Sequence, residues 1–248
     1  MLPFENQPKL IFHGAHHKMG TVWITRVLES IGNKYGLSVQ KVKRNTEQLL
    51  PGTDIVIASH SDMKLERIGD FVGSHMTRDP RDAIVSGYFY HLWTNEAWAH
   101  QPQEELDGQS FQQPLPSLGQ EEGILSEIRR FQLYTQNRNL LDWNFDDERI
   151  LEIKYEDLIE NEEAGFRRMF RHYGFVDSAV ETCLELARQF SFSKIAQRGV
   201  GQTSNNRHLR SGKPGQWREL FSDVHVEAVK SQFGELLIRW GYEENQDW

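Results

Sequence analysis

The stretch Gly14-Ala15-His16-His17-Lys18-Met19-Gly20-Thr21 decides how this chain is expected to fold. A short apolar run, Lys9–Phe12, precedes it. Val22–Ile31 follows it, with apolar residues at spacings of three and four that are typical of a helix. The two glycines let the backbone pass close to a ligand, and the start of a helix offers N–H groups to an anion. A strand, a glycine-bounded loop and a helix in this order predict a phosphate-binding α/β domain.

Strands and helices alternate along the rest of the chain. We expect strands at Asp54–Ala58, Phe71–Thr77 and Arg149–Tyr155. The expected helices are Asp82–His91, Gly123–Leu141, Leu158–Tyr173, Asp177–Gln189 and Asp223–Trp240. This alternation predicts one α/β domain over residues 1–248, with a central parallel sheet and helices on both faces. Two stretches, Thr94–Gln120 and Gly199–Gly215, are expected to be irregular.

The composition is that of a globular protein. The 248 residues include 28 Lys and Arg against 36 Asp and Glu, a net charge of −8. Wholesale disorder, a collagen-like structure and a membrane-spanning segment are therefore not expected, and no signal peptide is recognised. The single cysteine, Cys183, excludes an intrachain disulfide and a cysteine-rich metal site, which fits a reducing, cytoplasmic compartment. We expect neither a nucleic acid nor a membrane as partner.

The charge is unevenly distributed. Arg198–Arg218 has five basic residues and Asn6–Leu28 has three, and neither contains an acid. Thr94–Glu122 has six acids and no Lys or Arg, and Asp142–Glu163 has ten acids against two bases. The two basic segments indicate either ordinary variation of a solvated surface or two contacts to one polyphosphate-like anion.

The loop differs from the common nucleotide-binding pattern G-x-x-x-x-G-K-[ST]. Lys18 precedes Gly20 by two positions instead of following it, and Asp54–Ala58 leads into Ser59 and His60, not into an Asp that could bind magnesium. A loop that works without a metal suits a group with less charge than a γ-phosphate, and a sulfuryl group is one. We therefore expect no metal cofactor.

Four motifs, in order, resemble those of the sulfotransferase family, whose donor is 3′-phosphoadenosine 5′-phosphosulfate (PAPS; product PAP). Lys18-Met-Gly-Thr-Val-Trp23 is similar to K-S-G-T-T-W, and Arg78-Asp-Pro-Arg-Asp-Ala-Ile-Val-Ser86 resembles the second motif. Tyr155-Glu-Asp-Leu158 matches a Y-E-D segment, and Arg210-Ser-Gly-Lys-Pro-Gly-Gln-Trp217 looks like R-K-G-x-x-G-D-W. Together they cover most of the chain.

The resemblance implies a role for each motif. The first loop would hold the 5′ end of PAPS through Lys18, Met19, Gly20, Thr21 and Val22. Lys18 would lie on the bridging oxygen and stabilise its developing charge. Trp23 and Phe192 would stack on the adenine, although a tryptophan at a helix start is otherwise usually part of the core.

The same resemblance implies a site for the 3′-phosphate. Arg78, Ser86 and Arg210 would bind it, with backbone N–H groups of Ser211 and Gly212, in a loop over residues 198–218. On their own, an Arg-Asp-Pro-Arg turn and a helical Ser more often indicate a capped helix start. The Tyr155 hydroxyl could donate to the nucleotide, or Tyr155 could be a core residue.

His60 is the candidate general base. It follows the Asp54–Ala58 strand at its carboxyl end, where ligands gather in parallel sheets, and it matches the family's K-T-H segment. The pKa of an unperturbed histidine, about 6.5, suits removal of a proton from an attacking hydroxyl. His16, His17 and His91 are the rival bases. Ser86 completes the expected catalytic set with Lys18 and His60.

The sequence departs from the family pattern at several positions. Met19 and Val22 replace a Ser and a Thr of the first loop, Ala58 replaces a Lys two residues before the candidate base, and Ser211 replaces the Lys of the last motif. The expected donor site therefore has fewer charges and hydroxyls than the pattern. These departures concern affinity and fine geometry more than the type of reaction.

The acceptor is expected to be a small molecule with a hydroxyl or an amine, gated by residues 94–122. Acids and aromatic residues gather there: Glu96, Glu104, Glu105, Asp107, Trp93, Trp98 and Phe111. This composition favours either a cationic acceptor or a merely solvated acidic loop. Two alternatives to a sulfotransferase are a P-loop kinase that uses ATP and a non-catalytic module that binds PAP or another nucleotide.

Overall fold

The computed structural model describes residues 3–6, 8, 10–43, 48–61, 65, 68–104, 108–138, 140–207 and 210–248. The chain forms two compact units. The first, called here the sheet unit, contains residues 1–78 and 138–199, and the second, the helical unit, contains residues 79–137 and 200–248. Among the described residues, no helix combines the length and the apolar character that crossing a membrane requires.

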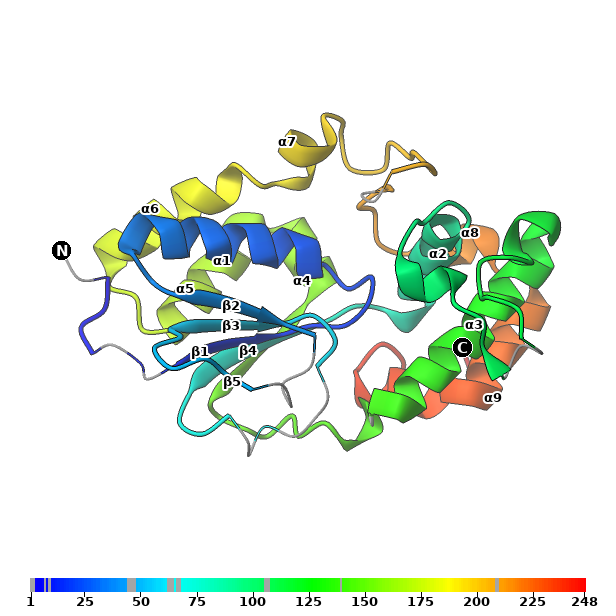
Figure 1. Cartoon of the computed structure of the whole chain (residues 1–248), viewed down its shortest axis with the longest axis horizontal. Coiled ribbons are helices and arrows are strands. Elements are labelled where there is room, and N and C mark those ends of the chain that lie inside the picture. Colours follow the sequence, from blue (N-terminus) through cyan, green and yellow to red (C-terminus); the bar gives the residue numbers. More distant parts are fainter. Residues whose placement is uncertain are drawn as a thin grey trace. The chain divides into compact units, whose positions relative to one another are not determined.

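The sheet unit is built on five parallel strands in the order β2-β3-β1-β4-β5 (Figure 1). Their bounds are β1 Ile11–Gly14, β2 Val39–Val42, β3 Ile55–Ala58, β4 Val72–Thr77 and β5 Ile150–Lys154. The first strand begins two residues later than the expected Lys9–Phe12, and Lys9 lies outside the described residues. Strand β2 was not predicted, because it lies at the edge of the sheet next to β3 and contains Gln40 and Lys41.

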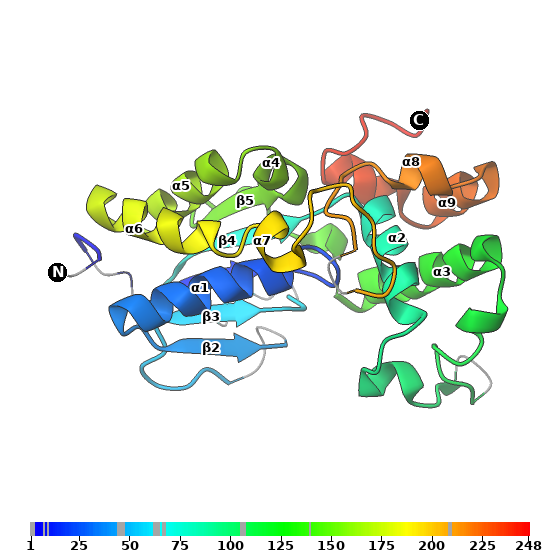
Figure 2. The same ribbon diagram turned by 90° about the horizontal axis from the view of Figure 1, so that it is seen from above.

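Helices cover one face of the sheet, as Figures 1 and 2 show. They are α1 Thr21–Tyr35, α4 Tyr155–Glu160, α5 Glu162–His172 and α6 Asp177–Arg188, and α7 Phe192–Ala196 follows α6. Ile11 and Ile55 point into the core beneath these helices. Their strand neighbours Phe12 and Val56 point to the opposite face, where Trp143 packs just after the short helix η5 Leu140–Asp142.

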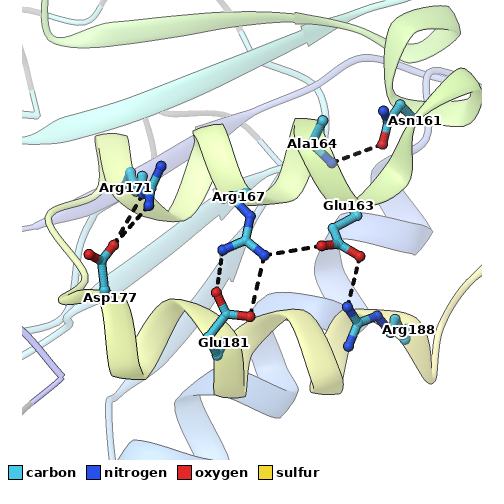
Figure 3. Close-up of polar contacts among 8 residues, drawn as sticks. All are labelled: Asn161, Glu163, Ala164, Arg167, Arg171, Asp177, Glu181 and Arg188. Carbon is cyan, nitrogen blue, oxygen red and sulfur yellow. Dashed lines mark hydrogen bonds and ion pairs between the residues drawn. The ribbon is translucent and has the colours of Figure 1, made fainter.

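The expected helix Leu158–Tyr173 is two helices instead of one. It breaks at Asn161, whose side chain accepts a hydrogen bond of 3.0 Å from the backbone N–H of Ala164 and so caps α5 (Figure 3). The preceding helix, α4, already begins at Tyr155, which was expected to end a strand. The tyrosine therefore lies directly beyond the carboxyl end of β5.

Ion pairs join α5 to α6 on the surface of the sheet unit (Figure 3). Arg167 binds Glu163 at 3.1 Å on its own helix and also Glu181 on α6. Arg188 of α6 binds the other oxygen of Glu163 at 2.8 Å. Beneath these exposed charges, the apolar sides of both helices pack into the core of the sheet unit.

The helical unit consists of α2 Pro80–His91, α3 Gln120–Arg138, α8 Trp217–Leu220 and α9 Asp223–Arg239, with the short helices η2 Ala97–His100 and η4 Leu115–Ser117. Helices α3 and α9 pack together: the rings of Phe131 and Phe233 are 5.4 Å apart, and His225 Nε2 lies 2.9 Å from the Glu121 carbonyl oxygen. The predicted α/β class with a parallel sheet flanked by helices is confirmed. Helices were expected on both faces of the sheet, whereas the α-helices of the sheet unit cover one face. The domain boundary of 1–248 and the loop boundaries stay predictions.

Candidate functional site

The loop from Gly14 to Gly20 joins β1 to α1 in a tight turn. Lys18 has φ of +63° and Gly20 has φ of +87°. A Cβ atom at Gly20 would lie 2.8 Å from the sulfur of Met76, so backbone conformation and space both require glycine here. Met19, which occupies the family's Ser position, is fully buried and packs into the interior. The loop thus wraps closely around the start of α1.

The start of α1 is suited to an anion. The helix has 15 residues and no acidic residue in its first turn. Its N-terminal N–H groups and the positive end of its dipole therefore meet no negative side chain of their own turn. The Thr21 hydroxyl donates a hydrogen bond of 3.1 Å to the His16 carbonyl oxygen, which also accepts from the Met19 N–H at 3.1 Å. These bonds fix the loop from within.

Two further motif residues meet the loop at the carboxyl ends of β4 and β5. Arg78 follows β4 directly, and its Nη1 donates a hydrogen bond of 3.0 Å to the Lys18 carbonyl oxygen. The Arg78 guanidinium also lies 4.6 Å from the centre of the Tyr155 ring. A cation over an aromatic face is a favourable contact. Three of the four motifs are thereby brought together in the sheet unit.

His60 lies two residues beyond β3, beside the same loop. Its backbone N–H donates to the Lys43 carbonyl oxygen at 2.8 Å, and the next N–H, that of Ser61, donates to the Ala15 carbonyl oxygen at 3.1 Å. The His60 ring stacks on the ring of His17, with centres 5.8 Å apart and planes 18° from parallel. The structure therefore places the predicted base against the predicted anion-binding loop, with His17 as its neighbour.

The other two rival histidines are enclosed in buried networks. His16 Nε2 lies 2.9 Å from His75 Nε2, and His75 Nδ1 lies 2.8 Å from Glu152 Oε2. In the helical unit, the His91 ring is fully buried, and its Nδ1 lies 2.7 Å from Glu127 Oε2. Arg130 and this histidine hold the pKa of the Glu127 carboxyl below its usual value, against the effect of burial, which is the largest single influence.

Trp23 and Phe192, the predicted adenine-stacking residues, are mostly enclosed. Trp23 is 6% exposed, and its ring packs edge to face with the rings of Tyr155 and Phe166. The ring centres are 6.3 and 5.4 Å apart, respectively. Phe192 is 5% exposed, with the Arg198 guanidinium 5.4 Å from its ring centre. Both side chains contribute to the packing of the sheet unit, and their stacking on a base stays a prediction.

The last motif folds against α2 within the helical unit. The Arg210 guanidinium lies 4.5 Å from the centre of the Phe89 ring, and its Nη2 donates to the Gln216 side-chain oxygen. The Gln216 amide nitrogen donates in turn to the Ser211 hydroxyl at 2.6 Å. Ser86 is half-buried three residues before Phe89 and therefore lies near the same face of α2.

The residues of the expected gating loop form an aromatic cluster. The Trp98 and Phe111 rings stack at 6.1 Å, and the Arg130 guanidinium lies 5.9 and 5.8 Å from their centres. Glu96 accepts hydrogen bonds from the Tyr90 hydroxyl at 2.7 Å and from the Trp98 indole N–H at 2.5 Å. Burial raises the pKa of Tyr90 to about 12. Two of the acids named for this loop, Glu105 and Asp107, lie outside the described residues.

Two residues that hold the last motif in place, Asp82 and Gln216, were not predicted from the sequence. Asp82 is 1% exposed and binds backbone N–H groups of the last motif, and Gln216 binds two of that motif's side chains. Asp82 belongs to the Arg-Asp-Pro-Arg-Asp stretch, but nothing in the sequence tells which partner such an acid has. In the part of the chain that the structure describes, no cluster of three or more His, Cys, Asp or Glu side chains could hold a metal ion.

The parallel sheet and the turn from β1 into α1 define an α/β protein with a phosphate-binding type of loop. The sequence profile of the sulfotransferase domain matches residues 75–241. The chain therefore belongs to the sulfotransferase domain family. The matched residues include Arg78, Ser86, Tyr155 and Arg210, whereas Lys18 and His60 precede them.

Individual relatives agree with this assignment. Sulfotransferase 6B1 of Mus musculus is 30% identical over 105 residues, which are 39% of this chain and 33% of that protein, so the match spans about a third of its length. The crystal structure of the mouse sulfotransferase SULT7A1 complexed with PAP has a TM-score of 0.54 at 16% identity and covers 94% of this chain and 85% of its own. Retinol dehydratase with androsterone and PAP has a TM-score of 0.56 at 13% identity, covering 94% and 82%. At these identities the two structures show the fold alone.

Proposed function

We propose that this protein transfers the sulfuryl group of PAPS to a hydroxyl or an amine of a small-molecule acceptor. One observation carries the proposal: residues after four different strands gather around one loop. Lys18 follows β1, His60 follows β3, Arg78 follows β4 and Tyr155 follows β5. The carboxyl edge of a parallel sheet is where such proteins bind their ligands.

Lys18 and the start of α1 would bind the phosphosulfate end of the donor. The loop has the helix N-terminus, the tight glycine turn and the lysine that an oxyanion requires. As the bond between sulfur and the bridging oxygen breaks, this oxygen gains negative charge. The Lys18 ammonium is proposed to stabilise that charge, which is larger in the transition state than in the bound donor.

His60 would act as the general base. The acceptor oxygen forms a bond to sulfur while the bond on the opposite side of sulfur breaks, and the acceptor proton passes to a ring nitrogen of His60. PAP leaves with the electron pair of the broken bond. The contact between His60 and His17 supports this role, because it fixes the base beside the loop that carries Lys18. Ser86 is proposed as the third member of the catalytic set.

The remaining motif residues would bind the rest of the donor. From the motif matches, we assign the 3′-phosphate to Arg78, Ser86, Arg210, Ser211 and Gly212. Guanidinium groups suit phosphate because their paired N–H groups match its oxygens. Tyr155 is proposed to reach the nucleotide with its hydroxyl, and Trp23 and Phe192 to flank the adenine.

The acceptor is proposed to be a small molecule. Retinol dehydratase has been solved with androsterone and with retinol, which supports this size class for the family. The acids Glu96 and Glu104 in the expected gating loop favour a cationic acceptor. Cationic amines should then be sulfated faster than neutral phenols of similar size. Equal rates would contradict the preference for a cationic acceptor. We place the reaction in a reducing, cytoplasmic compartment, because the single thiol of Cys183 is buried and unpaired with another cysteine.

A donor comparison tests the proposed function. The protein is incubated with a panel of phenols, alcohols and amines and with either PAPS in EDTA or ATP with Mg²⁺, and product masses are recorded. We expect sulfated products and PAP with PAPS, and none with ATP. Phosphorylated products from ATP, abolished by EDTA, would identify a P-loop kinase instead. Tight binding of PAP with no product from any acceptor would identify a non-catalytic module.

A further inference from the structure

We propose that Gln216, held in place by Asp82, is a positioning residue that orients Arg210 and Ser211 toward the 3′-phosphate of the donor. The inference rests on the proposed function and extends it to two residues that bind no ligand themselves. All the contacts that carry it lie within the helical unit.

Asp82 fixes the turn in which Gln216 lies. Its carboxylate accepts a hydrogen bond of 2.5 Å from the Gly215 N–H and one of 3.0 Å from the Trp217 N–H. The two donors flank Gln216 in the sequence, and Gly215 has φ of +75°, so the turn depends on a glycine and on this carboxylate. Asp82 is 1% exposed, and hydrogen bonds to a buried carboxylate are among the stronger ones.

Gln216 uses both ends of its amide on the two candidate phosphate-binding residues. Its oxygen accepts from Arg210 Nη2, and its nitrogen donates to the Ser211 hydroxyl at 2.6 Å. The three side chains are buried, with exposures of 9% for Arg210, 3% for Ser211 and 8% for Gln216. A guanidinium that is bonded at one edge and stacked on Phe89 has few other orientations available.

The neutral amide suits this task. A carboxylate at position 216 would orient Arg210 as well, but it would also compensate the charge that attracts a phosphate. The glutamine directs the guanidinium without placing a negative charge beside it. The Ser211 hydroxyl, which accepts from Gln216, keeps its own proton for donation to a phosphate oxygen.

Isothermal titration of PAP and of AMP, which lacks the 3′-phosphate, tests the assignment. Gln216→Met keeps the side-chain volume and removes both hydrogen bonds, and Asp82→Asn weakens the turn. We expect each to raise the Kd for PAP by about tenfold while the Kd for AMP changes less than twofold. The KM for PAPS should rise with kcat nearly unchanged, because neither residue touches the reacting atoms.

The controls are Gln136→Met, an exposed glutamine of α3, and Asp223→Asn, an exposed acid in the first turn of α9. Neither should change either Kd. The thermal midpoint checks that Gln216→Met is folded. An unchanged Kd for PAP in the folded variant would overturn the positioning role, and so would an equal loss of affinity for PAP and AMP. A wild-type protein that binds PAP no better than AMP would instead overturn the proposed 3′-phosphate site, and with it this inference.

Discussion

His60 is the residue on which the proposed chemistry depends most. The backbone at His60 is held by its N–H bond to the Lys43 carbonyl oxygen and by the next bond, from the Ser61 N–H to the Ala15 carbonyl oxygen, and both bonds remain when the ring is removed. The binding of the donor is assigned to other residues. Removal of the base should therefore separate binding from turnover.

His60→Ala is expected to lower kcat by at least about a hundredfold, a typical contribution of general base catalysis, with the Kd for PAP within about threefold of wild type. His172→Ala is a suitable control, because His172 belongs to α5 and lies outside the motifs and the expected gating loop. Steady-state kinetics with PAPS and calorimetry with PAP measure the two effects. A parallel loss of PAP binding would reassign His60 to the donor site.

The buried His13 is expected to make the stability of the fold depend on pH. The ring is fully buried beneath α5, with Nδ1 2.8 Å from the Ser74 hydroxyl, which lies 2.5 Å from the Tyr173 hydroxyl. Burial, with a smaller effect of His75, lowers the pKa of His13 to about 3. The unfolded chain, with a pKa near 6.5, thus binds more protons than the folded one between these values.

The free energy of unfolding should therefore fall as the pH falls from about 6.5 toward 3, by up to ~1.4 kcal/mol per pH unit from this group, and show no such loss above 6.5. In His13→Asn, which can still bond to Ser74, this contribution disappears. The difference in unfolding free energy between the two proteins, measured in urea at several pH values, should shrink as the pH is lowered. A constant difference would mean that folding does not lower the pKa of His13.

The elements of the sheet unit depend on their buried faces more than on their surface charges. Phe166 is 1% exposed and stacks on Phe170 with ring centres 5.6 Å apart, whereas its neighbour Arg167 makes the exposed ion pairs between α5 and α6 (Figure 3). Hydrogen bonding to Glu181 and Glu163 raises the pKa of Arg167, but a solvent-exposed pair adds little to stability.

We expect Phe166→Ala to lower the free energy of unfolding by about 3–5 kcal/mol, the usual effect of removing a buried aromatic ring. Arg167→Ala should change the thermal midpoint far less, and its small effect should vanish in high salt. Thermal unfolding of both variants at low and high salt checks this. A larger loss for Arg167→Ala would show that the charge network, and not the core, holds the two helices together.

The last motif shows how two departures can compensate each other. Ser211 and Gln216 stand where the family pattern R-K-G-x-x-G-D-W has Lys and Asp, and they are joined by a hydrogen bond of 2.6 Å. A neutral pair thus replaces a pair of opposite charges. The net charge of the motif is unchanged, although the sequence alone indicated a loss of charge at Ser211.

Gln216→Asp alone should raise the Kd for PAP by about tenfold, because a carboxylate beside Arg210 reduces the attraction of the guanidinium for phosphate. Adding Ser211→Lys should recover most of that loss. Calorimetry on Gln216→Asp, Ser211→Lys and the double variant gives the coupling free energy between the two positions. Purely additive effects would show that the two positions act independently.

Sequence patterns predicted most of the helices and strands, but not those whose local pattern is weak. Apolar runs and spacings were sufficient for β1, β3, β4 and β5 and for six helices, with bounds shifted by a few residues. The edge strand β2 has little apolar pattern, and the break at Asn161 depends on a capping bond that periodicity does not reveal. The helices α7 and α8 have only five and four residues.

At the scale of the whole molecule, the net charge of −8 is a poor guide to the ligand. The basic residues proposed for the donor, Lys18, Arg78 and Arg210, belong to separate motifs, and the acids are concentrated in other segments of the sequence. The motifs predicted the gathering of Lys18, His60, Arg78 and Tyr155. The bonds from Asp82 to Gly215 and Trp217, which hold the last motif, join residues more than 130 positions apart, and no single sequence specifies such contacts.

The central claim is that the loop carrying Lys18 serves sulfuryl transfer from PAPS. The most direct measurement is a single-turnover reaction of PAPS with a responsive acceptor in EDTA, with the product identified by mass spectrometry, for wild type, Lys18→Ala and the exposed control Lys194→Ala. We predict a sulfated acceptor with wild type and with the control, and a rate at least about a hundredfold lower with Lys18→Ala. Equal rates for all three proteins, or no sulfated acceptor from a wild-type protein that binds PAP, would contradict it.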